Sequence, residues 1–380
     1  MKLKNILFQA CALAGGTIIL SSCNDFLDRE PLSSVTPEVY FSTTDHFEAY
    51  SIAKYNNWFS SHAGYGMGIG NGDGGTDNAV SGGYNSTLYE KGAWKVPQSG
   101  GGWSFNDIRY CNYFFENAVP KYEAGQVSGS AADIEHYIGE MHFMRAWIYF
   151  SYLRKFGDYP IITEVLPDDK AVLMEKSVRQ PRNLVARFIL EDLDKAISML
   201  KGWGFASNNR INKETALLVK SRVALYEATF EKYHKGTGRV PGDANWPGKK
   251  VHPNFTLDVD KEVDFFLTQA LEAAEQVADK VTLTQNTGVA DPETISTTSG
   301  WNPYFEMFAS LDLSKNSEVL LWRSYAKTGS YSITHGAPAW VQSGSNNGLL
   351  KTYVESFLMK DGMPWYAATT SAPYMGDKTL

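Results

Sequence analysis

The sequence predicts a mainly α-helical protein, built from helix pairs with long irregular loops and few short strands. Several segments place apolar residues at the spacing of one helix face, whereas residues 318–322 form a short strand candidate. Two successive helices are expected to start near Arg182 and Lys213, ~30 residues apart, which is close to the period of a tetratricopeptide repeat. The match to the consensus of that repeat is weak, so this spacing alone does not distinguish it from a generic helical bundle.

The first 22 residues have the layout of a secretory signal peptide. Lys2 and Lys4 precede a mostly apolar run from Ile6 to Leu20. A spanning helix needs ~20 predominantly apolar residues, and this run is too short and too interrupted to be a good one.

Leu20-Ser21-Ser22-Cys23 resembles the lipobox of bacterial lipoproteins, in which the cysteine becomes the new N-terminus and carries acyl chains. The alternative is the end of an ordinary signal peptide. Each buried methylene contributes ~0.8 kcal/mol, so several acyl chains would anchor the protein firmly. The acidic residues just after Cys23 resemble the surface-export signal of lipoproteins in the Bacteroidetes group. We therefore expect residues 23–33 to be a lipidated tether on the cell surface, outside the outer membrane.

The three cysteines agree with this location. Cys11 would be removed with the signal peptide and Cys23 lipidated, which leaves Cys111 without a partner for an internal disulfide. Because Cys111 lies within an aromatic helical run, we expect it to be a buried small side chain.

The charge of the chain argues against nucleic acid as a partner. The formal net charge is −7, and removal of residues 1–22 takes away two lysines and leaves −9. An acidic chain without a basic run binds nucleic acid and anionic membranes poorly. Aromatic residues make up 13% of the chain, more than a core alone explains.

Helices alternate with loops from residue 34 onward. The expected helices are 34–60, 106–119, 133–156, 183–200, 213–232, 260–277 and 350–359. Within helix 133–156, Arg145 lies on the apolar stripe, where an internal ion pair is a better explanation than a ligand contact. His142 is close to the same stripe, so we expect a satisfied core residue rather than a metal ligand.

Two glycine-rich loops carry aromatic side chains. The first covers residues 60–102 and the second residues 329–348. Their glycine content excludes a helix, and loops of this length in a compact protein are usually functional or disordered. The aromatic residues argue against plain disorder.

Motifs of common enzymes and cofactor sites are missing. Residues 70–75 fit G-x-G-x-x-G, but no strand precedes them and no helix follows, so the match is one of chance. No H-E-x-x-H, G-x-S-x-G or phosphate-loop pattern occurs. Asp73 and Asp77 do not fit an EF-hand loop, although weakly bound calcium stays open. A hydrolytic carboxylate pair also stays open, since only its spacing in three dimensions defines it.

Sugar binding is consistent with the composition of the two loops. Aromatic rings stack on the apolar faces of pyranose rings, while Asp, Asn and Arg form hydrogen bonds with the hydroxyls. Lids and protein interfaces have similar loops, so composition alone is a modest indication.

Several stretches in the same order together resemble the SusD/RagB family of outer-membrane lipoproteins from starch-utilisation systems. They cover most of the mature chain, and the most specific are the residues after Cys23 and the Phe-Gly-Asp-x-Pro junction. The matching stretches are Cys23–Asp28 with Pro31, Glu140–Ala146, Phe156–Pro160, Lys213–Tyr226, Asn316–Leu320 and Phe357–Pro364.

This resemblance implies tetratricopeptide-like helix pairs and a cell-surface lid on a SusC-like TonB-dependent transporter. Such proteins bind a nutrient, usually a glycan, without cleaving it. It further implies ligand contacts in the two glycine-rich loops. Asp77 fits an aspartate of the family's first binding loop and Trp103 its tryptophan, while Asp73, Asn106 and Trp340 are expected by position. Among the loop aromatics, Trp94 and Tyr331 complete the candidate ligand-binding set.

The resemblance also sets the domain boundaries and the alternatives. We expect a signal peptide at 1–22, the lipidated tether at 23–33 and a helical nutrient-binding domain at 34–380. Family members continue well past the Asp361-Gly362 motif, so we expect the C-terminal part of the family fold to be missing from this chain. Alternative functions are a peptide-binding protein of the RagB type, a surface glycoside hydrolase and a purely structural role beside the transporter.

Overall fold

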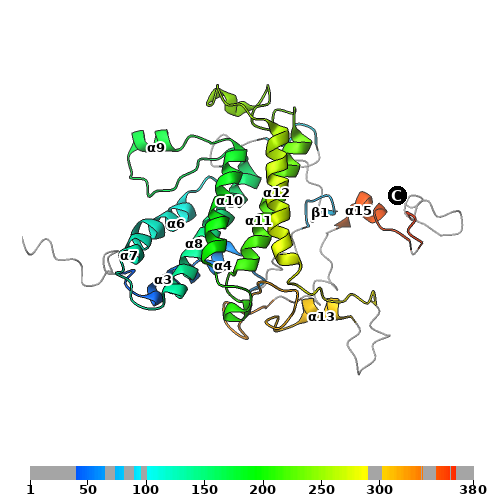
Figure 1. Ribbon diagram of the computed structural model, residues 1–380. Coiled ribbons are helices and arrows are strands. Elements are labelled where there is room, and N and C mark those ends of the chain that lie inside the picture. The colour runs from blue at the N-terminus through cyan, green and yellow to red at the C-terminus, as the bar shows by residue number, and fades with distance from the viewer. Residues whose placement is uncertain are drawn as a thin grey trace, which may run out of the picture.

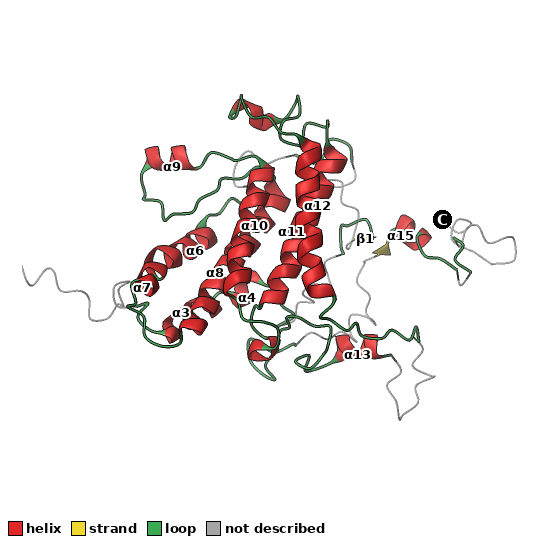
Figure 2. Ribbon diagram, in the orientation of Figure 1, coloured by secondary structure: helices red, strands yellow, loops and turns green. Residues whose placement is uncertain are grey.

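A computed structural model describes residues 40–64, 73–80, 90–95, 101–289, 302–334, 336, 348–359 and 361–364. Helices dominate, as expected (Figure 2). Within these residues, the α-helices are α3 Thr44–Ile52, α4 Tyr55–Trp58, α6 Asn106–Asn117, α7 Val119–Glu123, α8 Ala131–Phe156, α9 Lys170–Lys176, α10 Arg182–Met199, α11 Lys213–His234, α12 Val259–Ala278, α13 Pro303–Ala309 and α15 Lys351–Glu355.

Short 3₁₀ helices and one small sheet complete the described secondary structure. The 3₁₀ helices are η2 Phe205–Asn208 and η3 Pro247–Lys250. Strands β1 Ala79–Val80 and β2 Gly348–Leu349 pair antiparallel, with Ala79 opposite Leu349. None of the described helices is long and apolar enough to cross a membrane.

The centre of the fold is a row of four long helices. Helix α8 packs on α10, α10 on α11 and α11 on α12, so neighbours in the chain are neighbours in space (Figure 1). Helices α3 and α6 cover α8 on the side away from α11. This arrangement confirms the expected mainly helical fold.

Local sequence explains where these helices begin and end. Ser130 and Asn212 accept hydrogen bonds from the backbone N–H groups of Asp133 and Thr215, which caps α8 and α11. Helix α8 ends at Phe156, and Gly157 follows with a φ of +68°, a backbone conformation that favours glycine. Asp158 then accepts a hydrogen bond of 2.9 Å from the backbone N–H of Arg182, the first residue of α10.

Some of the expected elements are wrong, and the structure also contains helices that the sequence did not predict. The single helix 34–60 is two helices in its described part, α3 and α4, and residues 34–39 lie outside the described residues. Tertiary contacts explain the break, because Tyr50 before it stacks on Tyr110 of α6 at 4.2 Å whereas Tyr55 after it binds Glu140 of α8. Residues 318–322 form no strand, and α9 and α13 were not expected.

Helix 106–119 also differs from the expectation. It ends at Asn117, and α7 begins at Val119. Pro120 has no N–H group to donate to the preceding turn, so it occupies the first turn of a new helix instead.

Bidentate ion pairs join the long helices to each other. Asp192 of α10 accepts hydrogen bonds of 2.7 and 2.8 Å from the Nε and Nη2 atoms of Arg145 of α8. The same carboxylate lies 2.9 Å from Nδ1 of His142. The expected internal ion pair of Arg145 and the satisfied core position of His142 are both confirmed. Although burial alone would raise the pKa of Asp192, hydrogen bonds from Arg145 and His142 lower it.

Two similar pairs continue across the row. Arg182 of α10 binds Glu227 of α11 with distances of 2.8 and 2.7 Å. Arg187 of α10 binds Glu262 of α12 at 2.8 and 2.6 Å. The Arg182–Glu227 pair is buried and the Arg187–Glu262 pair is partly so. Breaking such a pair leaves a charge without compensation, which makes the helix register specific.

Glu231 of α11 is a buried carboxyl group in the same interface. Neither of its oxygens has a hydrogen-bond donor in the part of the chain that the structure describes. Burial raises its pKa to about 9, with the charges of Glu227 and Glu262 adding to the effect. Glu231 is therefore protonated at neutral pH and can donate its proton to Glu227.

We expect Glu231→Gln to stabilise the protein at alkaline pH. The folded pKa lies above the unfolded value, so the stability that the neutral form contributes is complete below about pH 4.5 and is lost as the pH rises through 9. Glutamine keeps a neutral donor, so the variant should be more stable by on the order of 1–3 kcal/mol near pH 8. Urea denaturation from pH 5 to 9 measures the difference.

Glu275→Gln on the exposed side of α12 is the control. If both variants show the same pH dependence as the parent protein, Glu231 is ionised in the fold and the assignment is wrong.

Candidate functional site

The beginning of the first glycine-rich loop lies against the beginning of the second and the segment just before it. The backbone N–H of Gly64 donates to the carbonyl of Ser332 at 2.8 Å, and Thr334 donates back to Gly64 at 3.0 Å. The backbone N–H of His62 donates to the hydroxyl of Tyr325 at 3.0 Å. The structure therefore brings together two regions that are more than 250 residues apart.

A cavity of about 420 Å³ lies beside this junction. Helix α4 and the start of the following segment form one wall, and residues 321–324 form the other. Its lining residues are Ile52, Tyr55, Asn56, Phe59, Ser60, Asn209, Leu321, Trp322, Arg323 and Ser324. The volume falls within the range of small-molecule sites, ~300–1,000 Å³.

Tyr55 is fixed in the cavity wall by the protein interior. Its hydroxyl donates to Oε1 of Glu140 at 2.6 Å and accepts from the backbone N–H of Ile211 at 3.1 Å. Arg210 holds Glu140 from the other side, with Nε 2.9 Å from Oε1. Burial opposes ionisation of Glu140, but the hydrogen bonds from Arg210 outweigh it and lower its pKa to about 2. Burial and the Glu140 charge raise the pKa of Tyr55 well above its usual value, so its hydroxyl stays a donor.

Trp322 is held by an unusual turn on the opposite wall. Its indole Nε1 donates to the carbonyl of Ser207 at 2.8 Å, and its backbone N–H donates to that of Asn208 at 3.1 Å. Ala206, Ser207 and Asn208 have φ values of 46°, 53° and 62°, in the left-handed region. Side chains other than glycine adopt this conformation at a cost, so the turn stores strain next to the cavity.

Arg323 links the two walls. One of its terminal nitrogens donates to the amide oxygen of Asn56, and the other lies 3.4 Å from the carbonyls of Phe59 and Ser60. The cavity therefore combines aromatic surface with amide and guanidinium groups. Such a surface can stack on an apolar face and form hydrogen bonds at its edges.

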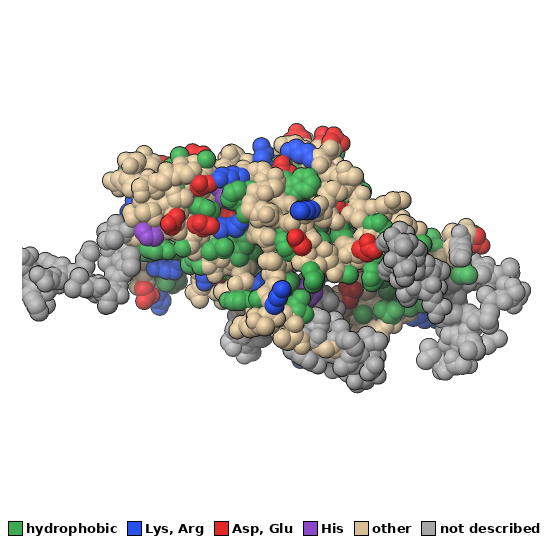
Figure 3. All heavy atoms as spheres, turned by 90° about the horizontal axis from the view of Figure 1, so that it is seen from below, with side chains coloured by type: hydrophobic (Ala, Val, Ile, Leu, Met, Phe, Trp, Pro, Cys, Tyr) green, Lys and Arg blue, Asp and Glu red, His purple; other side chains and the backbone are tan. Residues whose placement is uncertain are grey.

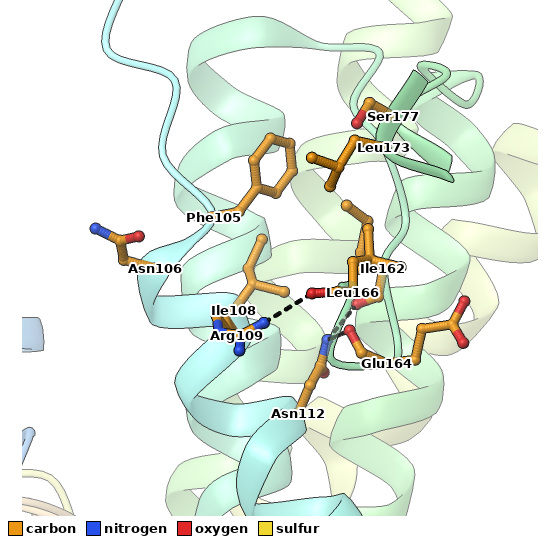
Figure 4. Close-up of a pocket in the computed structure, with 10 residues that line it drawn as sticks. All are labelled: Phe105, Asn106, Ile108, Arg109, Asn112, Ile162, Glu164, Leu166, Leu173 and Ser177. Atoms are coloured by element: carbon orange, nitrogen blue, oxygen red, sulfur yellow. Dashed lines mark hydrogen bonds between the residues drawn. The ribbon is translucent and has the colours of Figure 1, made fainter. Parts of the chain in front are cut away.

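A second, smaller cavity of about 140 Å³ lies between α6 and α9 (Figure 4). Phe105, Ile108, Leu166 and Leu173 make it mostly apolar. Two of the polar side chains shown in the figure already bind backbone carbonyls, since Asn112 donates to Ile162 and Glu164 at 3.0 Å and Arg109 donates to Leu166 at 2.9 Å, and Glu164 forms an ion pair with Lys176. This cavity thus offers few free polar groups to a sugar.

Exposed apolar surface does not single out a site. Seen from below, hydrophobic side chains lie in patches among polar and charged ones (Figure 3). Helix α13, for example, exposes Phe305 and Phe308 by 54% and 73%. The main cavity stands out by its shape and its convergent polar groups.

Trp103 is packed against other groups of the protein. Its ring stacks on those of Phe156 and Tyr159, with centroids 4.6 and 4.8 Å away. The guanidinium of Arg179 lies 4.6 Å from the centroid of the Trp103 ring. Its expected role as a ligand contact stays a prediction.

The remaining expected contacts are spread over the molecule. Asn106 begins α6 and borders the smaller cavity, while Asp73 and Asp77 are exposed in the turn before β1, on the other side of the fold (Figure 1). Trp94 and Tyr331 are exposed by 67% and 57%. The structure thus does not gather these residues into one site, and Trp340 and the lipidation residue Cys23 lie outside the described residues.

Sequence reasoning missed Tyr55, Asn56, Trp322 and Arg323 as a group. Trp322 beside Arg323 is the available indication in the sequence, but the pattern of this segment predicts a strand. Cys111 is fully buried as expected, and burial raises the pKa of its thiol. Within the described ranges, no group of three or more His, Cys, Asp and Glu side chains could hold a metal ion.

Solved structures show which fold this is. A SusD-like protein from Bacteroides fragilis matches 88% of this chain with a TM-score of 0.54 and 19% sequence identity. A SusD-like carbohydrate-binding protein from the same species matches 86% with a TM-score of 0.54 and 15% identity. The chain has the SusD-like fold and covers 56% of the length of each of these structures. No protein-family model matches the sequence, and no curated protein is significantly similar to it.

We expect Ala206→Gly to stabilise the turn that holds Trp322. A left-handed residue with a side chain costs ~1–2 kcal/mol, which glycine avoids, although glycine also gains freedom in the unfolded chain. The net gain should be roughly 0.5–1 kcal/mol in urea denaturation. Ala274→Gly within α12 is the control and should cost about 1 kcal/mol. Loss of stability in both variants would show that the turn is not strained.

Proposed function

We propose that this chain is a non-catalytic glycan-binding protein whose ligand occupies the cavity between α4 and residues 321–324. The observation that supports this most is the combination of aromatic and hydrogen-bonding side chains in that cavity. The proposal also draws on the fold, because one protein that shares it is described as carbohydrate-binding.

The cavity lining provides two kinds of groups for binding a sugar, namely aromatic rings and hydrogen-bonding side chains. Trp322, Tyr55 and Phe59 present apolar rings, against which the C–H face of a pyranose can stack. Asn56, Asn209 and Arg323 place amide and guanidinium groups near the edges, where sugar hydroxyls would lie.

The lining chemistry also favours binding over hydrolysis. The ten lining residues given above include no Asp or Glu, whereas most glycoside hydrolases use a pair of carboxyl groups around the scissile bond. Peptide capture, the second candidate, would use the same walls but would need partners for a peptide backbone. Release of reducing ends from a bound polysaccharide would overturn the non-catalytic proposal.

We further propose a surface location and a transport partner for the protein. Lipidation at Cys23 would tether it to the outer membrane, and a SusC-like TonB-dependent transporter would receive the glycan. Both proposals come from the sequence, through the lipobox and the family resemblance. Weak calcium binding at Asp73 and Asp77 likewise stays a prediction.

Trp322→Ala should weaken glycan binding about tenfold, since it removes one aromatic wall of the cavity. Affinity electrophoresis through gels that contain a neutral α-glucan, β-glucan or mannan measures retention. Trp94→Ala is the matched control, because Trp94 is exposed and outside the cavity. A thermal melt of each variant identifies loss of folding. If Trp94→Ala abolishes retention and a folded Trp322→Ala does not, the ligand binds at the loops instead.

Cys23→Ala should release the protein from membranes. Without acyl chains the apolar attachment is lost, so the variant should move from the membrane fraction to the soluble fraction after cell fractionation. Parallel fractionation in a strain without the transporter separates lipid anchoring from attachment to a partner. A variant that stays with the membrane in that strain contradicts lipid anchoring.

A further inference from the structure

A third cavity lies at the other end of α8, far from the proposed glycan cavity. It has a volume of about 340 Å³ and is lined by Asp158, Ser177, Val178, Arg179, Pro247, Gly248 and Val251. Glu140 of α8 binds Tyr55 in the wall of the proposed glycan cavity, and Phe156 at the end of α8 is two residues before Asp158 of the third cavity. At a rise of ~1.5 Å per residue, these two positions on α8 are about 24 Å apart. The two cavities are therefore separate sites.

Arg179 distinguishes this cavity from the rest of the protein. The arginines between the long helices each bind a carboxylate, but no Asp or Glu of the described chain lies within ion-pair distance of Arg179. Its guanidinium instead rests over the ring of Trp103, 4.6 Å from the centroid. Since Trp103 stacks on Phe156 and Tyr159, the cation has a rigid aromatic support.

Further cations surround the same region. The ammonium of Lys155 lies 5.1 Å from the centroid of the Phe156 ring, and a Cβ atom at Gly102 would collide with it. Lys249 and Lys250 belong to η3, whose Gly248 lines the cavity, and both are exposed. None of these three lysines forms an ion pair with a described residue. In a chain of net charge −7, this is a local excess of positive charge.

Asp158 is the acidic residue in the lining, and its oxygens are already engaged. Oδ1 accepts from the backbone N–H of Arg182 and Oδ2 from the indole of Trp246, both at 2.9 Å. Burial raises the pKa of Asp158, while these hydrogen bonds and the charges of Arg182 and Arg179 act in the opposite direction. Both oxygens of Asp158 thus have hydrogen-bond donors other than Arg179.

We propose that this cavity binds the anionic group of an acidic saccharide, with Arg179 as the principal contact. A guanidinium held over an aromatic ring leaves its N–H edge free, and this edge matches a carboxylate or sulfate with two parallel hydrogen bonds. Lys155, Lys249 and Lys250 add attraction at longer range. The proposal rests on the proposed saccharide binding and adds a class of substrate to it, namely uronic-acid or sulfated glycans.

Affinity electrophoresis of the full-length protein tests this proposal. The gels contain polygalacturonate as the carboxylated probe, chondroitin sulfate as a sulfated one, or the neutral glucans used above. Arg179→Gln should lower affinity for an acidic probe on the order of tenfold or more and leave retention by neutral glucans unchanged. Arg179→Lys keeps the charge without the planar fork and should give an intermediate loss.

Arg154→Gln is the control, because Arg154 is exposed on α8 and its guanidinium lies over Phe150 instead. Equal losses in Arg154→Gln and Arg179→Gln would mean unspecific charge attraction and overturn the proposal. Retention by neutral but not acidic probes would also overturn it, while the proposed function would stand. Retention by an acidic probe alone, with dependence on Arg179, would support this site and contradict the glycan cavity at α4. Melting curves confirm that the variants are folded.

Discussion

The fold depends on arginine–carboxylate pairs that cross its helix interfaces. Arg145 and Arg182 each hold a carboxylate of the next long helix in the row with two hydrogen bonds, and Arg187 of α10 holds Glu262 of α12 in the same way. Apolar side chains would allow helices to slide or rotate by a turn, but a paired buried charge has only one register in which both partners are satisfied. These pairs fix where α8, α10, α11 and α12 stand relative to each other.

That register positions the functional groups as well. Glu140 lies one turn and a half before Arg145 on α8, so the pair that fixes α8 against α10 also fixes Glu140 beneath Tyr55. At the other end of α8, the Gly157-Asp158 junction places Asp158 on the first N–H group of α10 and on Trp246. One rigid helix thus determines the geometry of both proposed binding cavities.

Sequence predicted the helices well and the site poorly. Helices α8, α10, α11 and α12 agree with their expected bounds within two residues, because their apolar stripes repeat over several turns. The break between α3 and α4 has no local cause and depends on contacts of Tyr50 and Tyr55 with different helices. The proposed glycan cavity combines α4 with residues 321–324, and no local pattern relates segments that far apart. The interior role of Arg145 was predictable, since a charge on an apolar stripe needs a partner.

The contact between Gly64 and Ser332 has a consequence for the order in which the molecule assembles. The helix row is held by neighbours in the chain and can form by local addition, whereas the hydrogen bond from His62 to Tyr325 closes a loop of 263 residues. Such closure carries an entropic cost that a few backbone hydrogen bonds only partly offset. We therefore expect the rim of the proposed glycan cavity to form after the helix row, and a saccharide in contact with both walls would hold these two distant segments together.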